Sequence, residues 1–152
     1  MKRFKNWKKP EFDEEGWAFT TGQNIFDMKK FGWRCQYSNN LKIGNGVDVG
    51  AFSYLNAKHG IILGDDVQIG GGCFLYSEST IDKKKGEITI ENGACIGANS
   101  VIFPHVVVGE NSIVGAGSVV TYGTIIPDFE IWVGNPAKRK GAILNGKRYY
   151  PE

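Results

Sequence analysis

Residues 96–109 read Ile96-Gly97-Ala98-Asn99-Ser100-Val101-Ile102-Phe103-Pro104-His105-Val106-Val107-Val108-Gly109, and an aliphatic side chain returns at every sixth position. The same spacing extends on both sides of this stretch. The series, which ends on a tryptophan, is Ile43, Val49, Leu55, Leu63, Ile69, Leu75, Ile90, Ile96, Ile102, Val108, Val114, Val120, Ile126 and Trp132. Glycine directly follows half of these positions, and the residue four places after each is nearly always small or apolar.

A period of six fits neither an α-helix, which repeats at 3.6 residues, nor a strand, which alternates at two. It fits a short strand and a tight turn, repeated so that equivalent side chains stack along one axis. Glycine beside the strands suits turns that need positive φ or close backbone approach. The pattern therefore predicts a β-solenoid, in which neighbouring repeats stabilise one another. An ordinary β-sandwich would not keep so strict a register.

Composition limits the remaining choices. A chain of 152 residues is one domain's length and can bury a core without disulfide or metal staples. Its net charge of +2 gives no strong field for nucleic acid or an anionic membrane. We expect no membrane span and no signal peptide, because no apolar run is long enough. Three cysteines without metal-ligand spacing indicate a reducing compartment, so we expect a cytoplasmic protein.

The repeats resemble those of the hexapeptide-repeat acyltransferases, and in particular the sugar O- and N-acetyltransferases. The most specific stretch continues from residues 96–109 through Gly115-Ala116-Gly117-Ser118-Val119-Val120 to Gly134-Asn135-Pro136-Ala137-Lys138. This resemblance implies an all-β fold, a left-handed parallel β-helix of triangular section with three hexapeptides per coil.

The resemblance also implies an activity. Members of the family transfer acetyl from acetyl-CoA, a cosubstrate, to an amino or hydroxyl group. The acceptor implied here is a sugar or nucleotide-linked sugar of the kind used for surface polysaccharides. The family's active sites lie between subunits, so the resemblance implies a homotrimer, and it implies no permanently bound cofactor and no metal.

Two interruptions of the register place the site. Grouping three repeats to a coil puts both of them, after Leu55 and after Leu75, at the same corner of the prism. Solenoids often project such insertions from their binding face. We expect this corner to collect polar and aromatic side chains from successive coils, namely Asn56, Lys58, His59, Tyr76, Ser77, Glu78, Ser79, Asp82, His105 and Tyr122. The polar segment 77–86 is either a solvated loop or an arm that reaches a neighbouring subunit.

Acyl transfer from a thioester needs a base that accepts the proton of the attacking group. The family's usual base is a histidine in the loop after the coil that ends at Leu75, and residues 76–82 contain none. Three alternatives remain for the base. Glu78 or Asp82 acts, with a pKa raised by partial burial; His59 or His105 acts from a neighbouring coil; or a sugar amine attacks in its neutral form without a strong base.

The missing loop histidine favours N-acylation. Ser77 stands beside Glu78 and completes the group of candidate catalytic residues.

The binding residues are expected at the coil edges. The candidates for acceptor binding are Asn56, Tyr76 and Ser79. The family lays the pantetheine arm of coenzyme A along the coils, which implies contacts at Ala98, Ala116, Thr121 and Tyr122. Lys138 and Arg139 suit its phosphates by charge, unless they belong to a solvated tail.

We divide the chain into three segments. Residues 1–40 lack the register and are rich in aromatic residues, which predicts a cap over the first coil, with a short helical turn at 27–31. Residues 41–136 form the β-helix, and residues 137–152 are a tail that closes the other end as a strand or a helix.

Two other functions share this fold. One is a non-catalytic scaffold, which the missing loop histidine favours and the long polar insertion disfavours. The other is a γ-class carbonic anhydrase, a zinc enzyme that takes three histidine ligands. Only His59 and His105 are present in the chain, without ligand spacing, so we expect no metal site of that kind.

Overall fold

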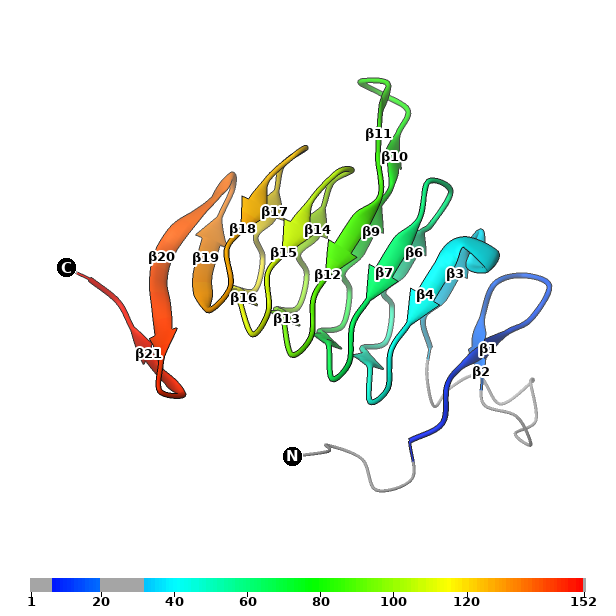
Figure 1. The fold of residues 1–152 in the computed structure, drawn as a ribbon. Helices are drawn as coiled ribbons and strands as arrows, with labels where there is room; N and C mark the ends of the chain where they lie inside the picture. Colours follow the sequence, from blue (N-terminus) through cyan, green and yellow to red (C-terminus); the bar gives the residue numbers. More distant parts are fainter. Residues whose placement is uncertain (1–6, 20–31, 152) are drawn as a thin grey trace.

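The computed structural model describes residues 7–19 and 32–151, and these form a parallel β-helix with three walls (Figure 1). The first wall contains β4 (Leu41–Ile43), β7 (Ile61–Leu63), β12 (Ile88–Ile90), β15 (Val107–Val108) and β18 (Ile125–Ile126). The second contains β5 (Asp48–Val49), β8 (Gln68–Ile69), β13 (Cys95–Ile96), β16 (Ile113–Val114) and β19 (Glu130–Gly134). The third contains β3 (Arg34–Gln36), β6 (Tyr54–Asn56), β9 (Phe74–Tyr76), β14 (Val101–Ile102) and β17 (Val119–Val120).

The predicted grouping of three repeats to a coil is confirmed by the strand register. On the third wall, Leu55 pairs with Leu75 and Leu75 with Ile102, in parallel. All three side chains are fully buried in the stack that fills the prism. Burial of each such side chain contributes about 1.5–3 kcal/mol, so the repeated aliphatic position is what holds the coils together.

Small residues four positions after a repeated aliphatic residue also form hydrogen bonds between coils at the corners. Ser53 and Ser100 are buried, and their hydroxyls donate to the carbonyl oxygens of Gly70 and Gly115 in the next coil, at 3.0 and 3.1 Å. A buried hydroxyl must find such a partner or lose free energy. These bonds tie each corner to the one above it, so the polar residues of the repeat stabilise the stack as well.

Glycine is required where successive corners approach closely. A Cβ on Gly70 would lie 2.6 Å from the backbone nitrogen of Ala98 in the next coil. Real Cβ atoms do not approach this closely, so only glycine fits there. The glycines noted in the sequence thus keep the coils in contact at the turns.

The described N-terminal residues pack against the first coil. β1 (Glu11–Phe12) pairs antiparallel with β2 (Ala18–Phe19), and Trp7 donates to the carbonyl oxygen of Val47 at 2.8 Å. Phe12 packs edge-on against Trp33, with ring centroids 5.3 Å apart. The predicted helical turn at 27–31 lies outside the described residues.

Parallel stacking starts before Leu41. In β3, Cys35 pairs with Leu55 and is itself buried, so β3 already forms part of the third wall. A short 3-10 helix, η2 (Ser38–Asn40), then leads into β4.

The C-terminal tail forms strands. β20 (Ala137–Leu144) pairs antiparallel with β19, and β21 (Lys147–Tyr149) pairs antiparallel with β20. Together they extend the second wall at the end of the prism, as Figure 1 shows. Within residues 7–19 and 32–151 there is no helix long and apolar enough to cross a membrane.

Candidate active site

Both register interruptions lie where the chain passes from the third wall to the first, as predicted. The shorter one forms the turn between β6 and β7. The longer one carries a hairpin of β10 (Glu78–Ser79) and β11 (Lys84–Lys85), which projects from the prism (Figure 1). We call residues 77–86 the arm. The corner therefore places the arm between the turn of the coil before it and the turn of the coil after it.

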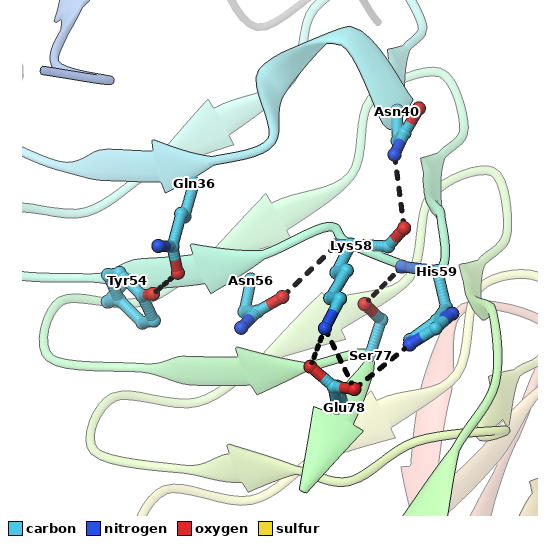
Figure 2. Close-up of polar contacts among 8 residues, drawn as sticks. All are labelled: Gln36, Asn40, Tyr54, Asn56, Lys58, His59, Ser77 and Glu78. Atoms are coloured by element: carbon cyan, nitrogen blue, oxygen red, sulfur yellow. Dashed lines mark hydrogen bonds and ion pairs between the residues drawn. The ribbon is translucent and has the colours of Figure 1, made fainter. Parts of the chain in front are cut away.

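One side of the arm meets the preceding turn through Glu78. Its carboxylate accepts from Lys58 Nζ at 2.8 Å (Oε2) and 3.1 Å (Oε1). The same Oε1 lies 3.3 Å from His59 Nε2. Figure 2 shows both side chains of the turn reaching this one carboxylate. Lys58, His59 and Glu78 thus form a hydrogen-bonded group at the surface, which we call the Glu78 cluster.

Two neighbouring residues hold the cluster in place. Ser77 is fully buried, and its hydroxyl accepts the backbone N–H of His59 at 2.9 Å. Asn56 accepts the backbone N–H of Lys58 through Oδ1 at 3.1 Å. Because Ser77 has no exposed surface, it positions His59 instead of contacting a substrate.

The expectation of a raised carboxyl pKa at the site is wrong. Hydrogen bonds from Lys58 and His59 lower the pKa of Glu78, and they outweigh the effect of burial. The pKa of Asp82 is also lowered, first by a hydrogen bond from Ser79 and further by Lys84. Both carboxylates are therefore ionised near neutral pH and are weak proton acceptors, which leaves the histidines as the stronger candidates.

The other side of the arm meets the following coils through His105. Its ring stacks on Tyr122, with centroids 5.9 Å apart and planes inclined by 26°. Lys84 Nζ lies 5.3 Å from the centroid of the Tyr122 ring and 3.3 Å from Asp82 Oδ2. The two histidines thus share the predicted corner but meet different partners, and only His59 contacts a carboxylate among the residues described.

The predicted coenzyme A residues do not gather in one place on a single chain. Ala98 and Ala116 are exposed at the corner between the second and third walls. Thr121 and Tyr122 lie at the corner of the arm. Lys138 and Arg139 are in β20 on the second wall, where Arg139 Nε donates to Glu130 Oε1 at 3.0 Å.

The predicted acceptor residues lie around the Glu78 cluster. Asn56 borders it directly, and Ser79 follows Glu78 in the arm. Tyr76 stacks on Phe74, with centroids 6.1 Å apart and planes inclined by 11°. Tyr54 joins these rings on the outer face of the third wall, 6.0 Å from Tyr76.

The sequence predicts Lys58 at this corner but assigns it no function. Tyr54 and Phe74 were not among the predicted site residues. Their signal was present, because Tyr54-Leu55-Asn56 and Phe74-Leu75-Tyr76 occupy equivalent strands with aromatic residues facing outward.

Two of the three cysteines, Cys35 and Cys73, are part of the packed core. Cys73 is buried in an inward position, as predicted, and burial raises the pKa of its thiol. Burial likewise raises the pKa of Cys35 to about 12. In the part of the chain that the structure describes, no three His, Cys, Asp or Glu side chains converge as a metal site would require.

Two family models match the coils. Residues 87–122 match the model described as bacterial transferase hexapeptide (six repeats). Residues 40–77 match the model described as hexapeptide repeat of succinyl-transferase.

Curated relatives match over part of their length. The mitochondrial gamma carbonic anhydrase 1 of Arabidopsis thaliana is 32% identical over 108 residues, covering 66% of this chain and 36% of the relative. A dTDP-3-amino-3,6-dideoxy-alpha-D-galactopyranose 3-N-acetyltransferase of Aneurinibacillus thermoaerophilus is 40% identical over 58 residues, which is 38% of this chain and 29% of that enzyme. The chain thus spans about a third of the curated relatives it matches.

Solved structures match more of the chain. A hexapeptide-repeat acetyltransferase of Vibrio cholerae superposes with a TM-score of 0.67 and 26% identity, covering 72% of this chain and 66% of that one. A maltose O-acetyltransferase of Clostridium difficile gives a TM-score of 0.66 and 25% identity, covering 74% of this chain and 64% of that one. The predicted left-handed parallel β-helix is confirmed by this agreement, and the chain is a hexapeptide-repeat protein with the fold of the acetyltransferases it resembles.

Proposed function

We propose that the protein is an acyltransferase that moves acetyl from acetyl-CoA to an amino or hydroxyl group of a sugar. The observation that carries this proposal is the pairing of His59 with Glu78 at the corner from which the arm projects. Similar proteins support the choice of substrates. The Vibrio cholerae acetyltransferase has been solved with acetyl coenzyme A, and two other relatives are named for acetylating maltose and a dTDP-linked amino sugar.

His59 is the proposed general base. Glu78 accepts from Nε2, which leaves the lone pair on Nδ1. Nδ1 has no hydrogen-bond partner among residues 7–19 and 32–151, so it is free to meet an acceptor. As the acceptor's oxygen or nitrogen attacks the thioester carbonyl, His59 takes its proton and the carbonyl oxygen becomes an oxyanion. Collapse of this intermediate expels the thiolate of coenzyme A and leaves the acetylated acceptor.

Glu78 has two effects on this step. Its hydrogen bond selects the tautomer of His59 and fixes the ring, and its negative charge stabilises the imidazolium that forms. General-base catalysis of this type contributes typically about 10²–10⁴-fold. A histidine base serves a hydroxyl as well as an amine, so the missing loop histidine no longer favours N-acylation. The nucleotide-linked amino sugar and the free sugar therefore both belong in the acceptor screen.

We propose a homotrimer as the active form. Ala98 and Ala116 lie at a different corner from His59, so one chain alone does not bring these two of the predicted coenzyme A contacts to the base. A neighbouring subunit that presents its own corner to the arm would bring them together. The rings of Tyr54, Phe74 and Tyr76, partly exposed on the wall between these corners, suit such a contact.

A γ-class carbonic anhydrase is the alternative that the Arabidopsis relatives suggest. Its zinc takes three histidine ligands, and this chain contains two histidines. The histidines also meet different partners at the corner, which supports the transferase instead.

Calorimetric titration with acetyl-CoA, with free coenzyme A alongside, tests the proposal. We expect saturable binding near one site per subunit and a trimer by light scattering. Release of the coenzyme A thiol is then followed with free amino sugars, neutral sugars and nucleotide-linked amino sugars as acceptors. If acetyl-CoA does not bind at millimolar concentration, the transferase is excluded and the scaffold becomes the better interpretation.

A further inference from the structure

Lys58 is held more firmly than a surface lysine usually is. Its backbone N–H donates to Asn56 Oδ1 at 3.1 Å, and its carbonyl oxygen accepts from Asn40 Nδ2 at 3.1 Å (Figure 2). The side chain therefore starts from a fixed point. An exposed ion pair normally gains little, because two long side chains must be ordered to make it. Here part of that ordering is already provided by the two asparagines.

The lysine contacts the carboxylate more closely than the histidine does. Lys58 Nζ lies 2.8 Å from Glu78 Oε2, whereas His59 Nε2 lies 3.3 Å from Oε1. The Glu78 side chain is 22% exposed and belongs to the arm, so His59 alone would hold it weakly. Ser77 fixes only the backbone of His59. The contact that fixes the Glu78 side chain is the one with Lys58.

Among the charged and titratable groups near Glu78, Lys58 has the largest effect on the pKa of its carboxyl group. The hydrogen bond from Lys58 is the largest cause of the lowered pKa of Glu78. Lys85 pairs with Glu78 across the hairpin through the backbone register. Glu87 lies beside Gly60, next to His59, and Tyr37 acts electrostatically on Lys58.

We propose that Lys58 is a positioning residue: it holds the Glu78 carboxylate directed at His59, and so maintains the base in its working tautomer. Its role in catalysis rests on the proposed function, whereas its control of Glu78 does not. Lys58 and His59 are adjacent in the chain, so a single turn supplies both the base and the cation that holds the base's partner. The arm in turn supplies the shared carboxylate.

The test compares Lys58→Met with Lys58→Arg and with Lys42→Met. Lys42 is exposed in β4 of the same coil, so its substitution removes the same charge away from the cluster. The first readout is NMR of the whole protein: the titration of the Glu78 carboxyl carbon, and the hydrogen-bonded imidazole N–H of His59. The chain has two histidines, so His59→Asn and His105→Asn assign the imidazole signals.

We expect Lys58→Met to move the Glu78 titration to higher pH and to weaken or abolish the His59 N–H signal. Lys58→Arg should keep most of both properties, and Lys42→Met should change neither. An unchanged Glu78 titration in Lys58→Met, or an equal change in Lys42→Met, would overturn the proposal. These measurements need no turnover, so they remain decisive even if no acceptor is acetylated, a result that would count against the proposed function alone.

Kinetics provide the second readout once an acceptor is found. We expect Lys58→Met to lower kcat by about fivefold, the ratio that one exposed ion pair of this kind supports, with little change in KM for acetyl-CoA. Lys58→Arg should recover most of the loss. A rise in KM for acetyl-CoA at unchanged kcat would instead place Lys58 in coenzyme A binding and overturn the positioning role.

Discussion

The hydroxyl of Ser77 accepts the backbone N–H of His59 at 2.9 Å, and this bond joins corner segments from two adjacent coils. Ser77 is also tied through its backbone, since its N–H donates to the carbonyl oxygen of Asn56 and its carbonyl oxygen accepts from Gly86. Ser77, the first residue of the arm, is thereby fixed to the preceding coil, and Gly86, the last residue of the arm, is bonded to Ser77. The position of His59 relative to Glu78 follows from this attachment.

Ser77→Ala should therefore destabilise the protein. It removes the acceptor for the His59 N–H at a site where Ser77 itself has no contact with solvent. An unpaired polar group in such a place costs about 1–3 kcal/mol of the free energy of unfolding. Urea denaturation at one fixed protein concentration measures the loss. Thr80→Ala, at an exposed position of the arm, is the matched control and should stay within about 0.5 kcal/mol of wild type.

The two histidines should differ in their effect on turnover. His59→Asn removes the proposed base and should lower kcat by about 10²–10⁴-fold, whereas His105→Asn should leave kcat close to wild type. Adding Glu78→Gln to His59→Asn should cause little further loss, because the two residues act as a unit. Release of the coenzyme A thiol with the best acceptor measures each rate. Equal losses for the two histidine variants would rule out this assignment.

Much of the fold follows from the sequence, because stacked aliphatic residues leave only one register. The grouping into coils and the corner of the arm follow from counting residues between Leu55, Leu63, Leu75 and Ile90. The start of the stack at Cys35 could have been found in the same way. Cys35 precedes Ile43 by the same interval that separates Leu55 from Leu63.

The partners within the site do not follow from the repeat. Both histidines lie at the predicted corner. Which of them contacts the Glu78 carboxylate depends on the conformation of the arm, and the repeat does not specify it. The direction of the Glu78 pKa shift depends on two hydrogen-bond donors from another coil, Lys58 and His59, and the sequence does not show that both reach it. The side-chain contacts between different loops therefore could not be predicted from the sequence.

The lowered pKa of Glu78 predicts a pH dependence of stability. Its pKa is lower in the folded state than in the unfolded chain, because Lys58 and His59 donate hydrogen bonds to the ionised form. Its contribution is thus present at neutral pH and is lost as the pH falls through the folded-state pKa. Urea denaturation of wild type and Glu78→Gln between pH 7 and pH 3 should show a stability difference that shrinks in acid. Glu110→Gln, which removes one carboxylate at an exposed turn away from the Glu78 cluster, is the control.

Gly86 and His105 should be coupled in stability. A Cβ on Gly86 would lie 2.7 Å from the Cβ of His105, so Gly86→Ala forces one of the two segments to move. We expect the free energy of unfolding to fall by about 1–3 kcal/mol, as for other overpacked sites.

His105 has a φ of 62°, a conformation that suits glycine. His105→Gly removes the obstructing Cβ and relaxes the backbone, which should offset the lost stacking on Tyr122. In that background Gly86→Ala should cost much less, and a double-mutant cycle by urea denaturation measures the coupling. The same cost for Gly86→Ala in both backgrounds would show that the contact with His105 is not what excludes a side chain there.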